Sequence, residues 1–324
     1  PQANIKNGNA VISVKDKSDT TMWSWHLWFA HNDVLDTICV LNHNFQRYYF
    51  TKQTLGQVYR KWEGAPYERP RVVRLKVEQT IGDGSGKRYA YIDTRQKPPR
   101  SVKEIISTLY QFGRKDAMSG IEEIADGTYI PNGGNNVSFK NCIQHPDTYY
   151  SGNKWHINPP EGFAYMNLWS MDNIKRSTYE EVDYTDTVVV KTIYDPCPVG
   201  YHLPTSNAFS GFSLTGRNTQ GVVGPTYTLF SNGKWEAPGW YFHTIPYPGP
   251  VDIEQGRTII FFPLVGYRWK YSGKVQRVGE AADYWAAIPE NRGAGTALSL
   301  TPVLIWPLDK DYKDDANAIR PIAE

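Results

Sequence analysis

Apolar and polar residues alternate over much of the chain, which is the pattern of half-buried β-strands. In TMWSWHLWFA, Trp23 and Trp25 fall on one face of such a strand, and Ser24 and His26 fall on the other. The preceding segment 9–16, NAVISVKD, alternates in the same way and is joined to it by the polar turn KSDT. We therefore predict an N-terminal hairpin with its tryptophan face in the core. His26 is expected to be a structural residue that is packed or hydrogen-bonded.

The same criteria predict a second hairpin, several later strands and one helix. Segments 71–80 and 87–96 alternate on either side of the glycine-rich IGDGSG, as the strands of a hairpin do. The spacing of Ser101 and Glu104 is that of a capping box, so SVKEIISTLYQF predicts a short helix over 101–112. Further strands are expected at 187–194, 258–269, 280–289, 296–306 and 317–324. The irregular stretches between these elements predict long ordered loops.

The composition supports short strands and aromatic surfaces. The chain has 11 Trp, 22 Tyr and 12 Phe beside 27 Gly and 22 Pro, a mix that favours strands and ordered loops over helices. Its formal net charge is only +2, so we expect no nucleic-acid partner. No apolar run reaches the roughly 18 residues that a membrane helix needs. Because the chain begins at Pro1, we expect a processed product or a fragment, with any targeting segment upstream.

The motifs give little support to metal or cofactor chemistry. Cys39, Cys142 and Cys197 have no CxxC spacing, and no HExxH or HxH pattern occurs, so zinc is not expected. The run DKDYKDD, 309–315, offers oxygen ligands for calcium, but it lacks the glycine and glutamate of an EF-hand loop and contains two lysines. We interpret it as a solvated acidic loop and leave calcium open there. No cofactor is expected.

No constellation of residues marks a catalytic site. Hydrolysis of a glycoside needs two carboxylates about 5 to 10 Å apart, and none of the 33 acidic residues is marked as such a pair. The acidic residues of the loops are interpreted as solvated, namely Glu122, Glu123, Glu180, Glu181 and Asp183. We therefore expect a protein that is not an enzyme.

The segment IYDPCPVGYHLPT, 193–205, has a strongly restricted backbone. Each of its prolines holds φ near about −65° and disfavours helix in the residue before it. We expect a rigid connector that places Cys197, Tyr201 and Leu203 against the core, with Gly200 providing backbone freedom. Cys197 is predicted to be a reduced, buried thiol that packs as a small apolar group.

Taken in order, the motifs resemble the C-terminal region of Bacteroidetes fimbrillin-type tip adhesins. These motifs are GNAVISVKD, MWSWHLWFA, LYQFGRKDAM, KTIYDPCPVGYHLPT, FPLVGYRW, VGEAADYWAA and the terminal IRPIAE. From about Thr37 onward the chain is similar to the Fibrobacter-type major paralogous domain, whose C-type-lectin-like fold also includes the formylglycine-generating enzyme. The resemblance implies an α+β, mostly β fold with long ordered loops. It implies a domain over 37–324, preceded by a strand pair over 1–36 that ends an upstream β-domain or belongs to this one.

The resemblance also carries expectations for single residues, with two departures. It implies that the CP-GY-LP segment enters the core and that the GYR, YW and final IR segments line a small sheet, so Trp285 is expected in the core. Relatives often pair the cysteine of the CPxGW segment with one in the last strand, where this chain has Pro321, so Cys197 lacks that partner. The YWSS of many relatives is YWAA at 284–287, which removes two hydroxyl groups.

The function implied by the resemblance is extracellular. It is that of the distal part of an adhesin at a fimbrial tip, with fimbrial subunits and a host or microbial glycan or protein as partners. Two alternatives stay open. One is a secreted carbohydrate-active enzyme or its accessory binding module, and the other is a purely structural fimbrial subunit.

A ligand site is expected in the long loop after the connector, where SNGKWEAPGWYFHTIPYPGP carries aromatic rings among glycines and prolines. Such a backbone would hold the rings rigidly at low entropic cost. Aromatic faces match the apolar faces of sugars, and carboxylates accept hydrogen bonds from their hydroxyls. The predicted ligand-binding residues are Trp235, Glu236, Trp240, Tyr241, Tyr247 and Asp252. The alternative is that these rings only pack the loop onto the sheet.

Overall fold

The computed structural model of the chain describes residues 7–61, 71–80, 87–96, 104–122, 137–171, 189–218, 230–246, 258–290 and 293–324. These residues are mostly β, with one α-helix, α1 (Phe139–Gln144), and a 3-10 helix over Ser206–Phe212. Among the described residues, no helix is long enough and apolar enough to cross a lipid bilayer. The chain divides into two compact units, Tyr59–Glu104 and the remainder, Pro1–Val58 with Ile105–Glu324.

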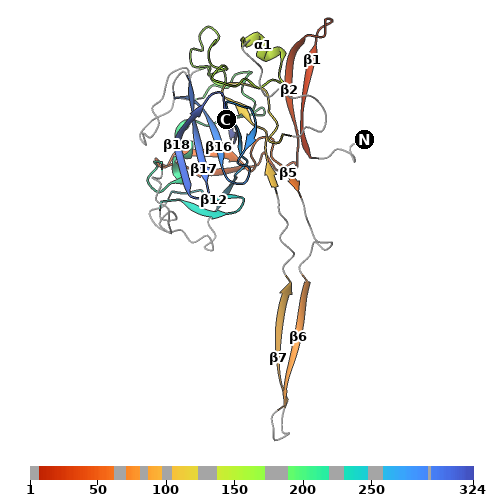
Figure 1. The fold of residues 1–324 in the computed structure, drawn as a ribbon. Coiled ribbons are helices and arrows are strands. Elements are labelled where there is room, and N and C mark those ends of the chain that lie inside the picture. Colours follow the sequence, from red (N-terminus) through yellow and green to blue (C-terminus); the bar gives the residue numbers. More distant parts are fainter. Residues whose placement is uncertain are drawn as a thin grey trace. The chain divides into compact units, whose positions relative to one another are not determined.

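The larger unit consists of small antiparallel sheets whose strands come from distant parts of the chain (Figure 1). Two four-stranded sheets have the orders β10 (Tyr201–His202), β20 (Ile322–Ala323), β4 (Arg47–Thr51), β3 (Thr37–Leu41), and β15 (Val275–Gln276), β14 (Tyr267–Arg268), β19 (Ala316–Asn317), β9 (Tyr110–Gln111). Two three-stranded sheets contain β11 (Gly233–Glu236), β12 (Gly239–His243), β13 (Ile259–Pro263), and β16 (Ala282–Pro289), β17 (Ala294–Thr301), β18 (Leu304–Tyr312). β5 (Val58–Lys61) pairs with β8 (Glu104–Ile106). The C-terminal strands β19 and β20 are therefore inner strands of two different sheets.

Aromatic rings fill the core of this unit. Phe212 stacks on Phe242 with ring centroids 4.3 Å apart, and Phe262 meets Phe50 edge to face at 6.0 Å. Trp285 is fully buried, and its Nε1–H donates a hydrogen bond to the backbone oxygen of Tyr110 at 2.7 Å. The predicted core position of Trp285 is confirmed.

The N-terminal hairpin forms as predicted, from β1 (Gly8–Lys15) and β2 (Thr21–Phe29). Its polar face contacts the rest of the unit. The Ser24 hydroxyl donates to Asp116 Oδ1 at 2.8 Å, and a ring nitrogen of His26 lies 2.8 Å from the Tyr110 hydroxyl. His26 is therefore a hydrogen-bonded structural residue, as predicted, and burial lowers its pKa to about 4.

The opposite face of the hairpin points away from the core, so the prediction for its tryptophans is wrong for Trp25. The Trp25 side chain is 47% exposed. Trp23 is half-buried, with the Lys115 ammonium 4.5 Å from its ring centroid. The alternation of β2 was assigned correctly, but the hydrogen-bonding side chains of the Ser24 face find partners inside the unit, and that decides which face packs.

The connector 193–205 is rigid for a reason beyond its prolines. The Asp195 carboxylate accepts backbone N–H bonds from Cys197 at 2.8 Å and Leu203 at 3.1 Å, and it pairs with the Lys191 ammonium at 2.9 Å. Cys197 is a buried free thiol, as predicted, and burial raises its pKa well above the ordinary value. Gly200 has φ 81°, a conformation that favours glycine.

Two predicted elements are wrong, and three predicted strands are each divided between two strands. The segments 258–269, 296–306 and 317–324 contain parts of β13 and β14, of β17 and β18, and of β19 and β20. The segment 104–112 is not helical, because it contributes β8 and β9 to two sheets, with Gln111 paired to Ala316. The predicted strand over 187–194 does not form in its described part, 189–194, where only Lys191 makes an isolated bridge. There the Thr192 hydroxyl accepts the backbone N–H of Tyr194 at 3.0 Å, which closes a turn instead.

The smaller unit contains the predicted second hairpin, β6 (Arg71–Thr80) and β7 (Lys87–Gln96). Its register places Leu75 opposite Ile92 and Arg74 opposite Asp93. The Arg74 guanidinium donates to the Asp93 carboxylate at 2.7 Å. Charged side chains of this hairpin are exposed, as expected for a solvent face.

Candidate ligand-binding surface

Trp240, one of the six predicted ligand residues, is a core residue. It is 2% exposed, its ring stacks on Phe242 with centroids 5.7 Å apart, and its Nε1–H donates to the Thr301 backbone oxygen at 2.8 Å. Trp240 and Phe242 are two residues apart on β12, so they share the face that packs inward. The ring has no face open to a ligand, which corrects the expectation for this residue.

The remaining predicted residues are divided between the two faces of the same sheet. Trp235 is half-buried against the core. Tyr241 lies on the outer face, half-buried, with its ring centroid 4.6 Å from that of Phe261. Glu236 is exposed. The last two predicted residues, Tyr247 and Asp252, lie outside the described residues.

A more exposed aromatic surface lies at the turn after β14 and at the end of β18. Trp269, Tyr271 and Tyr312, here called the aromatic patch, are 40%, 53% and 52% exposed. The rings of Trp269 and Tyr271 meet edge to face with centroids 5.0 Å apart. The Lys270 ammonium lies 4.9 Å from the ring centroid of Tyr271 and 2.8 Å from that of Tyr312. Lys270 thus joins rings from two distant segments into one surface.

The backbone that carries the patch is fixed by hydrogen bonds. The Gly273 N–H donates to the Trp269 oxygen at 2.7 Å, and the Trp269 N–H donates to the Lys274 oxygen at 3.0 Å. Arg268 is fully buried and donates to the backbone oxygens of Gly273 at 2.5 Å and Ser119 at 2.7 Å. The patch is therefore presented by a turn that is already ordered, which lowers the entropic cost of binding a ligand.

Carboxylates gather beside the patch. Asp283, Asp311 and Asp315 are here called the carboxylate cluster. Asp315 accepts the backbone N–H of Lys270 at 2.5 Å, and Asp311 accepts that of Tyr312 at 2.8 Å. Burial raises the pKa of Asp315 to about 7. Burial also raises the pKa of Asp283 well above the ordinary value, and the charge of Asp311 raises it further. The pKa of Asp311 is likewise raised by burial and by the charge of Asp315.

The run 309–315 is not the solvated acidic loop that we expected. It ends β18 and leads directly into β19, so Asp314 and Asp315 are buried between sheets. Asp314 accepts the backbone N–H of Trp155 at 2.7 Å. In the part of the chain that the structure describes, no group of three or more His, Cys, Asp or Glu is arranged to hold a metal ion.

The patch provides an aromatic surface whose rings offer flat apolar faces. Lys270 and Asp315 are buried, and they hold the turn that carries these rings. The sequence contains a signal that was missed, because RWKYSGK alternates aromatic and lysine residues where strand 258–269 enters a glycine turn. Turns and loops run over the protein surface, which is why these rings remain exposed.

Comparison of the chain with protein-family models, with curated proteins and with solved structures finds no match.

Proposed function

We propose that this protein is the ligand-binding region of an extracellular adhesin of the fimbrial tip type and that it binds a glycan through the aromatic patch. It is not an enzyme in this proposal, and its other partners are fimbrial subunits. The C-type-lectin-like fold belongs to the same proposal, which the order of the sequence motifs and the β-rich architecture support.

The observation that carries the proposal is the combination of exposure and rigidity in the aromatic patch. Aromatic side chains as large as Trp269 and Tyr271 bury much apolar area when they pack, so their exposure on an ordered turn needs an explanation. A sugar ring supplies an apolar C–H face that matches such rings. The surface is thus suited to a saccharide without needing to reorganise.

The carboxylate cluster raises the alternative of a glycoside hydrolase, because raised carboxyl pKa values are typical of a general acid. The hydrogen bonds of the cluster favour binding over hydrolysis. The Asp311 carboxylate accepts from the Tyr312 N–H and from the Asn317 amide at 2.7 Å, and Asp315 accepts from the Lys270 N–H. A general acid must reach the glycosidic oxygen, whereas these two groups are occupied in holding β18, β19 and the turn together.

The test is retention of the protein on an array of neutral and acidic glycans, comparing wild type with the double variant Trp269→Ala, Tyr271→Ala. We expect at least a tenfold loss of retention with little change in melting temperature, because both residues are exposed. Phe45→Ala is the matched control, since Phe45 is 66% exposed on a different turn. Its retention should equal that of wild type.

Three results would overturn the proposal. Retention by the double variant equal to that of wild type would exclude the patch. Absence of wild-type retention on every glycan would favour a structural subunit. Release of reducing sugar from a retained glycan would favour the enzyme.

A further inference from the structure

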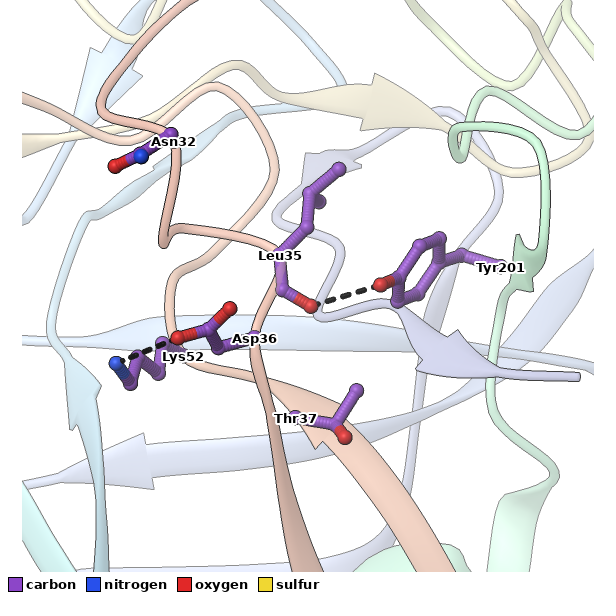
Figure 2. A pocket seen from close by; sticks show the side chains of 6 residues that line it. All are labelled: Asn32, Leu35, Asp36, Thr37, Lys52 and Tyr201. Carbon is purple, nitrogen blue, oxygen red and sulfur yellow. Dashed lines mark hydrogen bonds and ion pairs between the residues drawn. The ribbon is translucent and has the colours of Figure 1, made fainter.

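A hollow with a volume of about 620 Å³ opens on the larger unit and shares no lining residue with the aromatic patch. It is lined by Asn32, Leu35, Asp36, Thr37, Lys52 and Tyr201. These residues come from three segments, namely the turn after β2 with the start of β3, the end of β4, and the connector. In Figure 2, Tyr201 points toward Leu35 from one side, and Lys52 and Asp36 meet on another. We propose that this hollow is a binding site for a neutral saccharide unit.

The walls of the hollow are fixed before any ligand arrives. The Tyr201 hydroxyl donates to the Leu35 backbone oxygen at 2.8 Å, which ties the connector to the turn. The Lys52 N–H donates to the Asp36 backbone oxygen at 2.8 Å. The buried Arg320 guanidinium donates to the Lys52 backbone oxygen at 2.6 Å. Every wall therefore has a backbone anchor, and little ordering is needed on binding.

The charges of the lining select against ionic ligands. The Lys52 ammonium lies 3.0 Å from the Asp36 carboxylate and 3.5 Å from that of Asp33, so one positive charge faces two negative ones. The excess negative charge disfavours phosphate, sulfate and acidic sugars, and the ammonium disfavours a metal ion. The same groups still offer both donors and acceptors to an uncharged ligand.

The remaining groups match a polyol. The amide of Asn32 and the hydroxyl of Thr37 each donate and accept, and the Tyr201 ring is the only aromatic surface in the lining. Vicinal hydroxyls of a pyranose donate to a carboxylate and accept from an ammonium at the same time. The volume lies within the roughly 300 to 1,000 Å³ of small-molecule sites. For an apolar ligand, the lining offers only the Leu35 side chain and the Tyr201 ring as apolar contacts.

The test is saturation-transfer difference NMR on the full chain with a panel of methyl glycosides of glucose, mannose, galactose, fucose and N-acetylglucosamine. Each is used at about 10 mM, which is above the ~1 mM dissociation constant of a weak ligand. N-acetylneuraminic acid is the acidic comparison. We expect transfer to at least one neutral glycoside, reduced at least tenfold in affinity by Asp36→Asn or by Lys52→Met.

The matched control is Asp19→Asn, which removes the carboxylate of another exposed ion pair, Lys15 with Asp19 at 3.1 Å. It should leave transfer unchanged. Ion pairs between exposed side chains contribute little to stability, so neither variant of the hollow should move the melting temperature by more than about 2 °C.

The proposal for the hollow can be tested independently of the proposal for the aromatic patch. Transfer that survives Trp269→Ala, Tyr271→Ala and is lost in Asp36→Asn supports the hollow. Transfer lost only in the patch variant overturns the hollow and leaves the adhesin proposal intact. Transfer to the acidic sugar alone, or to no neutral glycoside of the panel, also overturns it.

Discussion

Two tryptophan-bearing segments are similar in sequence and lie in opposite surroundings. GKWEAPGWYF and GYRWKYSGK both place aromatic residues among glycine and lysine, yet Trp240 is 2% exposed and Trp269 is 40% exposed. Trp240 lies on the inner strand β12, between β11 and β13, and alternation sends its ring into the core. Trp269 follows β14, in a turn where its side chain stays 40% exposed. The comparison shows that the element around an aromatic residue, more than its neighbours in sequence, decides whether it packs or stays available.

The largest expected change in the free energy of unfolding tests the difference between Trp240 and Trp269 directly. Trp240→Ala should lower the free energy of unfolding by about 3 to 5 kcal/mol, because a buried ring and its hydrogen bond to Thr301 are lost together. Trp269→Ala should change it by less than about 1 kcal/mol. Urea unfolding followed by far-UV circular dichroism measures both. Equal losses in the two variants would contradict the assignment of core and surface.

The second prediction concerns pH and the cluster beside the exposed segment. The pKa of Asp315 is raised to about 7, whereas that of an unfolded aspartate is about 3.9. Between these values the folded state keeps a proton that the unfolded state has lost, so stability from this group is complete below about pH 4 and falls as pH rises toward 7. We expect a loss of about 3 to 4 kcal/mol over this range from Asp315, since each pKa unit corresponds to about 1.4 kcal/mol. The pKa of Asp315 is also affected by the groups that face it, which are Asp311, Asp283 and Lys270.

The variant Asp315→Asn isolates that contribution. Asparagine keeps an acceptor for the Lys270 N–H and gains a donor toward Asp311, but it carries no charge at any pH. Unfolding measured from pH 4.5 to 8 should therefore show a flatter profile, with the variant more stable than wild type above pH 7. Parallel profiles for the two proteins would refute the raised pKa.

Much of the fold follows from the sequence, and the failures have physical causes. Both hairpins are predicted correctly, because apolar and polar residues alternate along their strands. The strand that carries Trp285 was predicted over 280–289 and forms over Ala282–Pro289, although its residues do not alternate. The predicted helix at 101–112 fails because Gln111 pairs with Ala316, about 200 residues away, and a local capping pattern contains no information about such a partner. The prediction of the ligand surface fails at Trp240 for a related reason, since the segment is strand β12 and its ring packs inward and hydrogen-bonds to Thr301, 61 residues later in the chain.

The third prediction sharpens the account of β12. A methyl group on Gly239 would press against the backbone of Phe262 and Pro263 and against the ring of Phe261. Gly239→Ala should therefore destabilise the protein by about 1 to 3 kcal/mol, as overpacking does. Gly8→Ala is the control, because a methyl group there has no atom within 4 Å. Differential scanning calorimetry of both variants should show a lower melting temperature only for Gly239→Ala, and an unchanged one would mean that β13 does not lie against β12 as described.

The smallest effect is expected at Trp25, which lies on a strand and is nevertheless exposed. The two faces of the N-terminal hairpin differ in burial, as the segments around Trp240 and Trp269 do. Trp28, on the packed face, donates its Nε1–H to the Gln57 backbone oxygen at 3.2 Å, whereas Trp25 projects from the other face and is 47% exposed. Trp25→Ala should change the free energy of unfolding by about 0.5 kcal/mol or less, and Trp28→Ala by more than 1 kcal/mol. If urea unfolding instead shows the larger loss for Trp25→Ala, the tryptophan face packs inward after all, and exposure on this hairpin would not be decided by the hydrogen bonds of the Ser24 face.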